Sequence, residues 1–255
     1  MHEQWIQPDW PVSPNVRAVI TTRAGGVSTG PYGVPPEMRE GMNIGLSTGD
    51  VAANVQANRT RLRAYLPAEP RWLNQVHSAS VVDATRIVDN GTNQADALFT
   101  DVANVVCTVL VADCMPVLLA DTAGQCVGIA HAGWRGLAAG IIQATAQAMQ
   151  RRVERAGSEL LAYLGPAIGP RHFEVGAEVL DAMRKCLPKA ESAFIALGDG
   201  KYRADLFALG RLALEAAGVT RIYGGQDCTF SDARRFYSFR RDRITGRHAA
   251  LIWRV

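Results

Sequence analysis

The feature that most restricts how this chain can fold is a series of short apolar segments between residues 71 and 130. Each segment is five to nine residues long, and turn-forming residues such as those in DTAGQ separate them, a pattern typical of buried β-strands. The pattern therefore predicts a central sheet. Its expected strands are WLNQV (72–76), SVVDA (80–84), NVVCTVLVA (104–112), PVLLA (116–120) and CVGIA (126–130).

Other segments extend this arrangement on both sides. Further strands are expected at VRAVITT (16–22), LLAYL (160–164), 221–223 and 249–253. Apolar residues at helical spacing, together with capping and terminating residues, predict four helices. These cover residues 51–66, 136–156, 176–187 and 205–217.

The segment before the first helix is expected to be a long loop. Residues 25–49 are dense in Gly, Pro, Ser and Asn, and loops of this length usually have a function. Asp50 is suited to cap the helix that follows, and Pro67 to end it. Since no linker or repeat divides the sequence, we expect one mixed α/β domain over residues 1–255.

Composition narrows the possible partners. The chain is 48% hydrophobic, and 27 Lys and Arg against 24 Asp and Glu give a net charge of +3. That charge is too small to attract nucleic acid or a membrane by itself. Five cysteines without CxxC spacing fit free thiols in a reducing compartment, and the N-terminal residues do not resemble a signal peptide. We therefore predict a soluble, cytoplasmic protein.

Three residues suited to binding a metal follow predicted strands. His77 follows LNQV, Cys114 follows VLVAD, and His131 follows CVGIA. Two imidazoles and a thiolate suit Zn²⁺, and three protein ligands leave a fourth position open, as in catalytic zinc sites. A structural role stays open as well, because lone cysteines are mostly small buried hydrophobic residues and strand-end histidines often only form hydrogen bonds.

Two arginine-containing motifs are candidates for binding anions. In HAGWRG, Arg135 lies at the expected start of a helix, where backbone amides favour an anion. The segment RRFYSFRRDRITGR (234–247) combines six arginines with three aromatic residues, which fits phosphate or base binding but also a solvated edge. If FYSFRRD is a strand, Tyr237 and Phe239 face one side of it.

Taken together, the motifs resemble a known family. TTRAGGVSTGPY, NIGLSTGD, LNQVHSASV, ADALFTD, VADCMPVLLAD, HAGWRGLAAG, GPAIGP, FEVGAEV and DCTFSDARRFYSFRRDRITGR occur in the order found in the YfiH-like family, also called the laccase-domain or polyphenol-oxidase family. The resemblance runs from about residue 21 to 253, and the ADC and HAGWRG elements are specific to that family. Where members often have SYRRD this chain has SFRRD, so we expect Phe239 to be a packing residue.

The resemblance implies a fold, a metal and an activity. The fold is an α+β, α/β/β/α sandwich of the CNF/YfiH-like type with two sheets between helices. The metal is zinc, held by His77, Cys114 and His131. Some members are purine nucleoside enzymes that phosphorolyse adenosine, inosine and methylthioadenosine and deaminate adenosine. Others are peptidoglycan editing factors that remove misincorporated L-Ser from a UDP-MurNAc precursor.

Composition limits the copper chemistry that the laccase name implies. A multicopper oxidase needs more imidazole ligands than five histidines supply, so four-copper chemistry is excluded. A single Cu²⁺ bound in vitro at the same three ligands remains open, because such sites bind Cu²⁺ more tightly than Zn²⁺.

The leading hypothesis is a zinc-dependent enzyme acting on a purine nucleoside and phosphate, as a monomer or homodimer. In it the metal activates water at adenine C6 or helps place phosphate against ribose C1′. The remaining roles fall to residues that each also have a structural alternative. Asp113 orients or protonates the base, and Asn43 and Gln75 bind sugar or base edges. The phosphate candidates are Arg135 and the arginines of the 240–247 stretch, with Arg240 and Arg241 named among them.

Two other hypotheses stay open. In a cysteine amidase, the Cys114 thiolate, activated by His77 or His131, attacks a muropeptide amide. In a non-catalytic protein, the arginine-rich segment binds nucleotide or single-stranded nucleic acid, which leaves the His/Cys/His placement unexplained.

Overall fold

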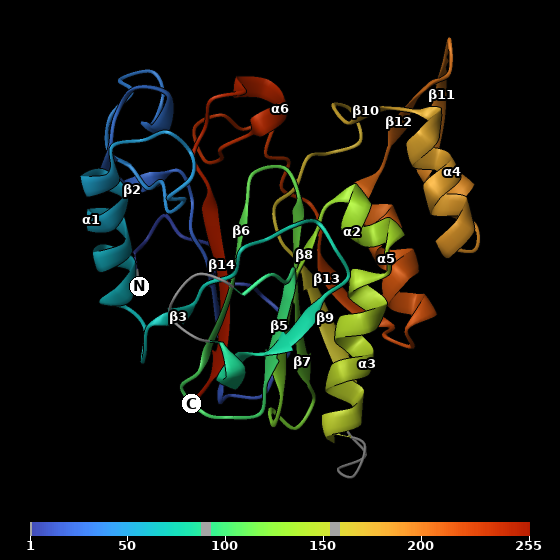
Figure 1. The fold of residues 1–255 in the computed structure, drawn as a ribbon, viewed down its shortest axis with the longest axis horizontal. Coiled ribbons are helices and arrows are strands. Elements are labelled where there is room, and N and C mark those ends of the chain that lie inside the picture. The colour runs from blue at the N-terminus through green and yellow to red at the C-terminus, as the bar shows by residue number, and fades with distance from the viewer. Residues whose placement is uncertain (1, 88–92, 154–158) are drawn as a thin grey trace.

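Two sheets packed face to face form the centre of the protein, and helices cover the outer face of each (Figure 1). The computed structural model describes residues 2–87, 93–153 and 159–255. This arrangement confirms the α/β/β/α sandwich implied by the family resemblance. That residues 1–255 make up one domain stays a prediction.

The larger sheet has six strands and contains most of the predicted central strands. Its strand order is β13 (Arg221–Gly224), β9 (Leu160–Leu164), β7 (Met115–Asp121), β8 (Val127–Ala132), β5 (Ala97–Thr100) and β4 (Val81–Asp83). β7 and β8 lie in the middle and every residue in them is buried, so they read as continuous apolar runs rather than alternating ones. The short β5 and its place beside β8 are not predicted from the sequence.

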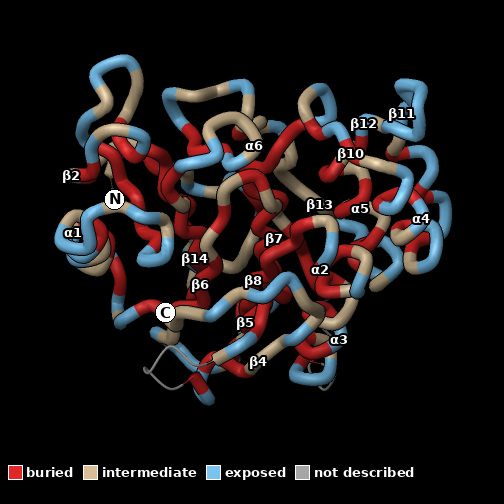
Figure 2. The backbone as a smooth tube through the Cα atoms, turned by 45° about the horizontal axis from the view of Figure 1, so that its top comes forward, coloured by how far each residue is buried: buried red, intermediate tan, exposed pale blue. Residues whose placement is uncertain are grey.

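The smaller sheet has four strands in the order β1 (Val16–Ile20), β14 (His248–Arg254), β6 (Val106–Val111) and β3 (Pro70–Arg71). Side chains from both sheets meet between them. Figure 2 shows that most of the residues in the central strands are buried. Ile20, Val109 and Ile252 come from the smaller sheet, and Leu118, Ile129 and Leu161 from the larger one. Burying a side chain of this size stabilises the fold by about 1.5–3 kcal/mol.

Helices cover the outer faces as their apolar positions require. α1 (Ala52–Arg63) packs Leu62 on the smaller sheet, and α3 (Ile141–Val153) packs Ile142 and Met149 on the larger one. α2 (Trp134–Ala138) and α5 (Leu206–Ala216) cover the larger sheet beside α3. The remaining elements are β2 (Ala24–Ser28), α4 (Ala177–Cys186), α6 (Phe239–Asp242) and a small sheet of β10 (Glu174–Gly176), β12 (Lys201–Ala204) and β11 (Phe194–Gly198).

Several expected elements differ from the observed ones. The single helix expected at 136–156 is two helices, because the chain turns at Gly140, whose φ is +86°; residues 154–156 lie outside the described part. The expected strand at 72–76 is wrong, since β3 ends at Arg71 and the following residues run irregularly across the cleft. The expected loop at 25–49 contains β2.

The expected cap is also wrong, and the FYSFRRD segment is not a strand. The N-cap of α1 is Val51, whereas the Asp50 carboxylate accepts hydrogen bonds from Ser28 Oγ at 2.6 Å and Asn43 Nδ2 at 3.0 Å. The FYSFRRD segment turns into α6 instead of forming a strand, so Tyr237 is fully buried while Phe239 is 48% exposed.

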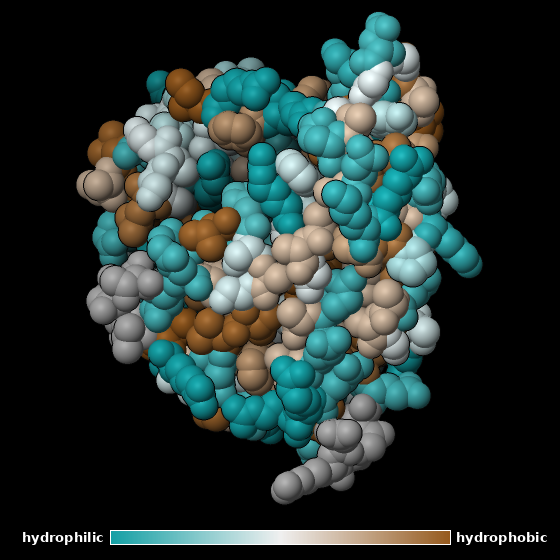
Figure 3. Space-filling model, turned by 45° about the vertical axis from the view of Figure 1, so that its right-hand side comes forward, coloured by the Kyte–Doolittle hydropathy of each residue, from teal (hydrophilic) through white to brown (hydrophobic). Residues whose placement is uncertain are grey.

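The surface is mainly polar where helices and loops form it. Figure 3 shows hydrophilic side chains over most of one face, with a band of apolar side chains across its middle. Within the described residues, no helix combines the length and apolar character needed to cross a membrane.

Candidate metal centre and cleft

Two of the three expected metal ligands are placed by the pairing of β7 with β8. Cys114 directly precedes β7, and His131 lies within β8 opposite Pro116. The antiparallel register therefore brings Cys114 and His131 to the same end of the larger sheet. His131 is buried and Cys114 is half-buried.

The third ligand, His77, lies in a loop rather than at the end of a strand. It is exposed, and its φ of +60° is unusual for a residue other than glycine. Gly133 leaves room for this loop, because a Cβ atom there would lie 2.7 Å from Cys114 Sγ and 3.3 Å from His77 Cδ2. The expected convergence of the three side chains is thus observed, although His77 is presented by a loop and not by the end of a strand.

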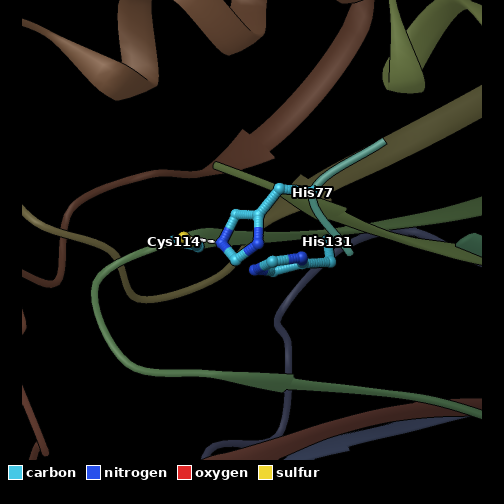
Figure 4. A group of neighbouring side chains, drawn as sticks. All are labelled: His77, Cys114 and His131. Carbon is cyan, nitrogen blue, oxygen red and sulfur yellow. Dashed lines mark hydrogen bonds between the residues drawn. The ribbon is translucent and has the colours of Figure 1, made fainter. Parts of the chain in front are cut away.

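The three side chains face one another closely (Figure 4). One ligand atom from each lies within 4.8 Å of the others, and Cys114 Sγ is 3.9 Å from His77 Nε2. Ligands bound to one tetrahedral zinc are separated by about 3.6 Å for a sulfur and a nitrogen, given the usual zinc bond lengths. The donor atoms therefore fit a zinc ion after only a small adjustment.

The electrostatics of the site favour a thiolate. Burial opposes ionisation of Cys114, but His131 and His77 outweigh this and lower the pKa of Cys114 to about 6. Burial likewise opposes a charge on His131, but Cys114 and Asp96 raise the pKa of His131 to about 9. By contrast, burial raises the pKa of Cys126, which lies in the core, to about 12. Cys114 therefore has the ionisation of a metal ligand or nucleophile.

A residue that the sequence analysis does not identify, Asp96, fixes the orientation of His131. Asp96 Oδ1 lies 2.9 Å from His131 Nδ1, and both side chains are buried. A hydrogen bond at Nδ1 places the proton there and leaves the Nε2 lone pair for the site. The sequence signal for Asp96 is one carboxylate in an apolar segment, which is common in proteins.

A cleft of about 990 Å³ opens beside these residues, at the upper end of the size range of small-molecule sites. The cluster lines it together with Gln75, residues 45–48 of the long loop, and several groups that the sequence analysis does not identify individually. These are Arg59, Arg63, Trp72 and Arg247. Phe239 also lines the cleft, so the expectation that it is a packing residue is wrong.

The arginines of the cleft have distinct environments. Arg59 lies over the ring of Trp72 at 4.0 Å and donates from Nε to Ile44 O at 3.0 Å. Arg247 donates to the carbonyls of Thr245 and Gly246. Burial lowers the pKa of Arg247, and the negative charge of Cys114 opposes that shift, so its guanidinium lies within the field of the cluster.

Two other expected substrate-binding residues have roles in the local structure. Gln75 lines the cleft, but its amide forms paired hydrogen bonds with the backbone of Leu110 at 2.9 and 2.7 Å. Asn43 is fully buried and joins the 45–48 segment to the C-terminal segment by accepting from the backbone N–H groups of Gly45 and Arg247.

The other expected site residues lie away from the lining of the cleft. Asp113 accepts from Thr229 Oγ1 and from the backbone N–H of Arg240, both at 2.6 Å. Arg240 donates to Glu174 O, and Arg135 lies exposed over the ring of Trp134. Arg241 donates to three backbone carbonyls and to Asp242. Of the expected substrate-binding residues and Asp113, only Gln75 lines the cleft.

Comparisons with known proteins identify the family. Residues 17–255 match a family described as multi-copper polyphenol oxidoreductase laccase. The chain belongs to this family, which is the YfiH-like, laccase-domain family that the sequence motifs resemble.

Named relatives and solved structures agree with this assignment. The chain is 46% identical to a purine nucleoside phosphorylase of Pseudomonas aeruginosa and 44% identical to the purine nucleoside phosphorylase YfiH of Escherichia coli, in each case over 98% of both chains. A protein of Neisseria meningitidis shares the fold with a TM-score of 0.88 at 45% identity over 99% of both chains. YlmD of Geobacillus stearothermophilus also gives 0.88, at 35% identity over 100% of this chain and 97% of that one.

Proposed function

We propose that the protein is a zinc-dependent purine nucleoside phosphorylase. The observation that carries the proposal is that two imidazoles and a thiolate-forming cysteine converge in the wall of a cleft that arginines also line. The names of the relatives support an enzyme of this class. The finer activities implied by the family, which are phosphorolysis of adenosine, inosine and methylthioadenosine and deamination of adenosine, are part of the proposal.

His77, Cys114 and His131 would hold the metal. When bound, zinc would supply a Lewis acid for a phosphate or water oxygen. The soft thiolate suits Zn²⁺ and the imidazoles suit Zn²⁺ or Cu²⁺, so copper at this one site in vitro remains compatible with the donor set.

Arg247 and Arg59 would hold phosphate. Each guanidinium lines the cleft and is partly held in place, Arg247 by backbone carbonyls and Arg59 by Trp72 and Ile44. A guanidinium binds phosphate oxygens through two parallel hydrogen bonds, and a side chain already held in place loses little entropy on doing so. These two residues are preferred to Arg241, another of the expected phosphate candidates, because Arg241 donates to backbone carbonyls and Asp242.

Trp72 and Phe239 would contact the nucleoside base. Both aromatic side chains line the same cleft as the metal ligands, and Phe239 is half-exposed. Purine bases stack on aromatic rings with a gain of about 1–3 kcal/mol. Stacking holds the base without contacting the ring substituents in which purines differ, which suits the range of purine nucleosides in the proposal.

A second candidate function is a cysteine amidase that removes L-Ser from a peptidoglycan precursor. It is favoured by the same lowered pKa of Cys114, because a thiolate beside two imidazoles is also the arrangement of a thiol hydrolase. The two functions differ in what they need. The amidase needs a free thiolate, whereas the phosphorylase needs the sulfur bound to metal.

Turnover of inosine by zinc-loaded protein tests the proposal. With phosphate present we expect hypoxanthine and ribose 1-phosphate, and we expect neither product without phosphate or after chelation. Equal release of hypoxanthine without phosphate, and no sugar phosphate, would show a hydrolase. Turnover of a serine-containing muropeptide that survives chelation, with no nucleoside turnover, would show the amidase.

A further inference from the structure

The carboxylate of Asp96 contacts both histidines of the cluster, although it is not expected to bind the metal itself. Asp96 lies directly before β5, is fully buried, and accepts five hydrogen bonds. One comes from the ring of His131, which lies on β8. The other four come from the loop that carries His77, so this carboxylate connects two segments of the chain that are far apart in sequence.

The contacts to the loop form an anion-binding nest. The backbone N–H groups of Val76, His77 and Ser78 donate to the Asp96 carboxylate at 3.3, 2.9 and 2.7 Å, and Ser78 Oγ donates at 3.0 Å. Consecutive N–H groups pointing at one anion occur where the backbone leaves the usual extended or helical conformation. The left-handed conformation of His77 is of this kind, and it is unfavourable without such support.

The backbone of Asp96 strengthens the same connection. Its N–H donates to Ser80 O at 3.0 Å, and its carbonyl accepts from the N–H of His131 at 2.7 Å. The residue is thus fixed between the loop and β8.

We propose that Asp96 is the positioning residue of the metal centre, because it sets the tautomer of His131 and the conformation of the loop that presents His77. The inference rests on the metal site of the proposed function. Since both histidines depend on this carboxylate, metal affinity depends on it more than on any hydrogen bond made to one ligand alone. Partners of metal-binding histidines commonly change metal affinity by about 10–100-fold.

The test compares Asp96→Asn with Asp121→Asn. Asp121 is a matched control, because it too is fully buried and accepts from backbone N–H groups, those of Cys126 at 2.6 Å and Ala123 at 3.2 Å, but it is the last residue of β7, at the opposite end of that strand from Cys114. An asparagine at position 96 keeps the size of the side chain but replaces one acceptor oxygen by an NH₂ donor. That donor would face the N–H donors of the nest. Dissociation constants for Zn²⁺ and Co²⁺ would be measured on folded protein by competition with a chromophoric chelator.

We expect Asp96→Asn to weaken binding of both ions about 10–100-fold and to change the thiolate-to-Co²⁺ absorption band. We expect Asp121→Asn to lower the unfolding temperature without changing either measurement. Equal affinity of Asp96→Asn and the unaltered protein would overturn the inference and leave the metal site standing. Failure of the unaltered protein to bind either ion would overturn both.

Ser78→Ala provides a milder second variant. It removes the hydroxyl that donates to Asp96 and keeps all three backbone N–H groups of the nest. We expect binding of Zn²⁺ to weaken several-fold, with the fold retained. If Asp96→Asn does not fold, unchanged affinity of Ser78→Ala would count against the inference, and weakened affinity would support it.

Discussion

The cluster of His77, Cys114 and His131 and the arginine-rich segment at 234–247 are both polar regions beside the same cleft, but they use their polar groups differently. In the cluster, the donor atoms face one another and the cleft. In the arginine-rich segment, Arg241 bonds backbone carbonyls and Asp242, and Arg235 pairs with Asp227. Polar groups that already bond within the fold stabilise it, whereas groups that face a cavity are available to a ligand.

Arg247, at the end of that segment, shows that the difference is not one of residue type. Its guanidinium lines the cleft, and its backbone N–H bonds to Asn43 Oδ1. Within one stretch of sequence, therefore, Arg241 bonds within the fold away from the cleft, whereas Arg247 bonds two carbonyls and also lines the cleft.

The largest expected effect comes from removing a member of the cluster. His77→Ala, Cys114→Ala and His131→Ala should each reduce bound zinc from about one ion per chain to nearly none, because two remaining ligands hold zinc weakly. Elemental analysis of folded protein measures this. Cys186→Ala, on α4, is the control and should keep its zinc. Full zinc content in all three variants would remove the distinction between the two regions.

The next effect sharpens the contrast between Cys114 and the cysteines of the core. In metal-free protein, labelling of Cys114 by iodoacetamide should rise with pH through a midpoint near 6, because its thiolate forms above that pKa. At neutral pH its thiolate fraction is about 30-fold above that of an ordinary thiol. Peptide mass spectrometry would follow the labelling.

Added zinc should slow the labelling of Cys114. Cys107 and Cys126, which are buried and have raised pKa values, should stay unlabelled in folded protein. Rapid labelling of Cys114 in fully metallated protein would contradict the ligand role.

Two arginine variants test the difference within the C-terminal segment. Arg247→Ala should raise the KM for phosphate about 10-fold, since it removes a binding group for substrate and transition state alike. Arg241→Ala should instead lower the free energy of unfolding by about 2–4 kcal/mol, because several backbone carbonyls lose their donor. Steady-state kinetics and denaturant unfolding measure the two effects. If Arg241→Ala raised the KM and Arg247→Ala lowered only the free energy of unfolding, the roles assigned to the two arginines would be exchanged.

The smallest effect tests how closely the cluster is packed. Gly133→Ala places a methyl group 2.7 Å from Cys114 Sγ and should weaken zinc binding about 3–10-fold by displacing that ligand. Gly136→Ala, whose nearest contacts lie at 3.3 Å and involve no ligand side chain, is the control. Zinc competition would measure both. Identical affinities would mean that the site adjusts freely.

The central strands and the main helices could be predicted because their signals are local. β6, β7, β8 and β9 correspond to apolar segments bounded by turn residues, and α3 buries Ile141, Ile142, Thr145 and Met149 at the expected spacing. β11 and β12 could not be predicted because they are short and bury almost nothing: β11 is exposed after Phe194, and Ala204 is the one buried residue of β12. The apolar segment at 72–76 was mistaken for a strand because nothing in its own residues shows that it borders a cleft.

The sequence identifies the three residues that converge in the cluster, and little else of the site. His77, Cys114 and His131 carry distinctive chemistry, and the family resemblance marks the same positions. Asp96 could not be found this way, because its role depends on β5 pairing with β8. Arg240 and Arg241 looked like phosphate ligands because a sequence shows a guanidinium but not its partners.

The register of β7 and β8 determines whether the side chains of Cys114 and His131 face the same side of the sheet. His131 lies opposite Pro116, two residues after Cys114. Since successive residues of a strand point to opposite faces, deleting a single residue from β8 before His131 would turn its ring away from Cys114. Residues inserted in the turn at 122–125 leave that pairing unchanged. A longer turn therefore keeps Cys114 and His131 facing each other, whereas a change in the length of either strand keeps them so only if it preserves the side to which both side chains point.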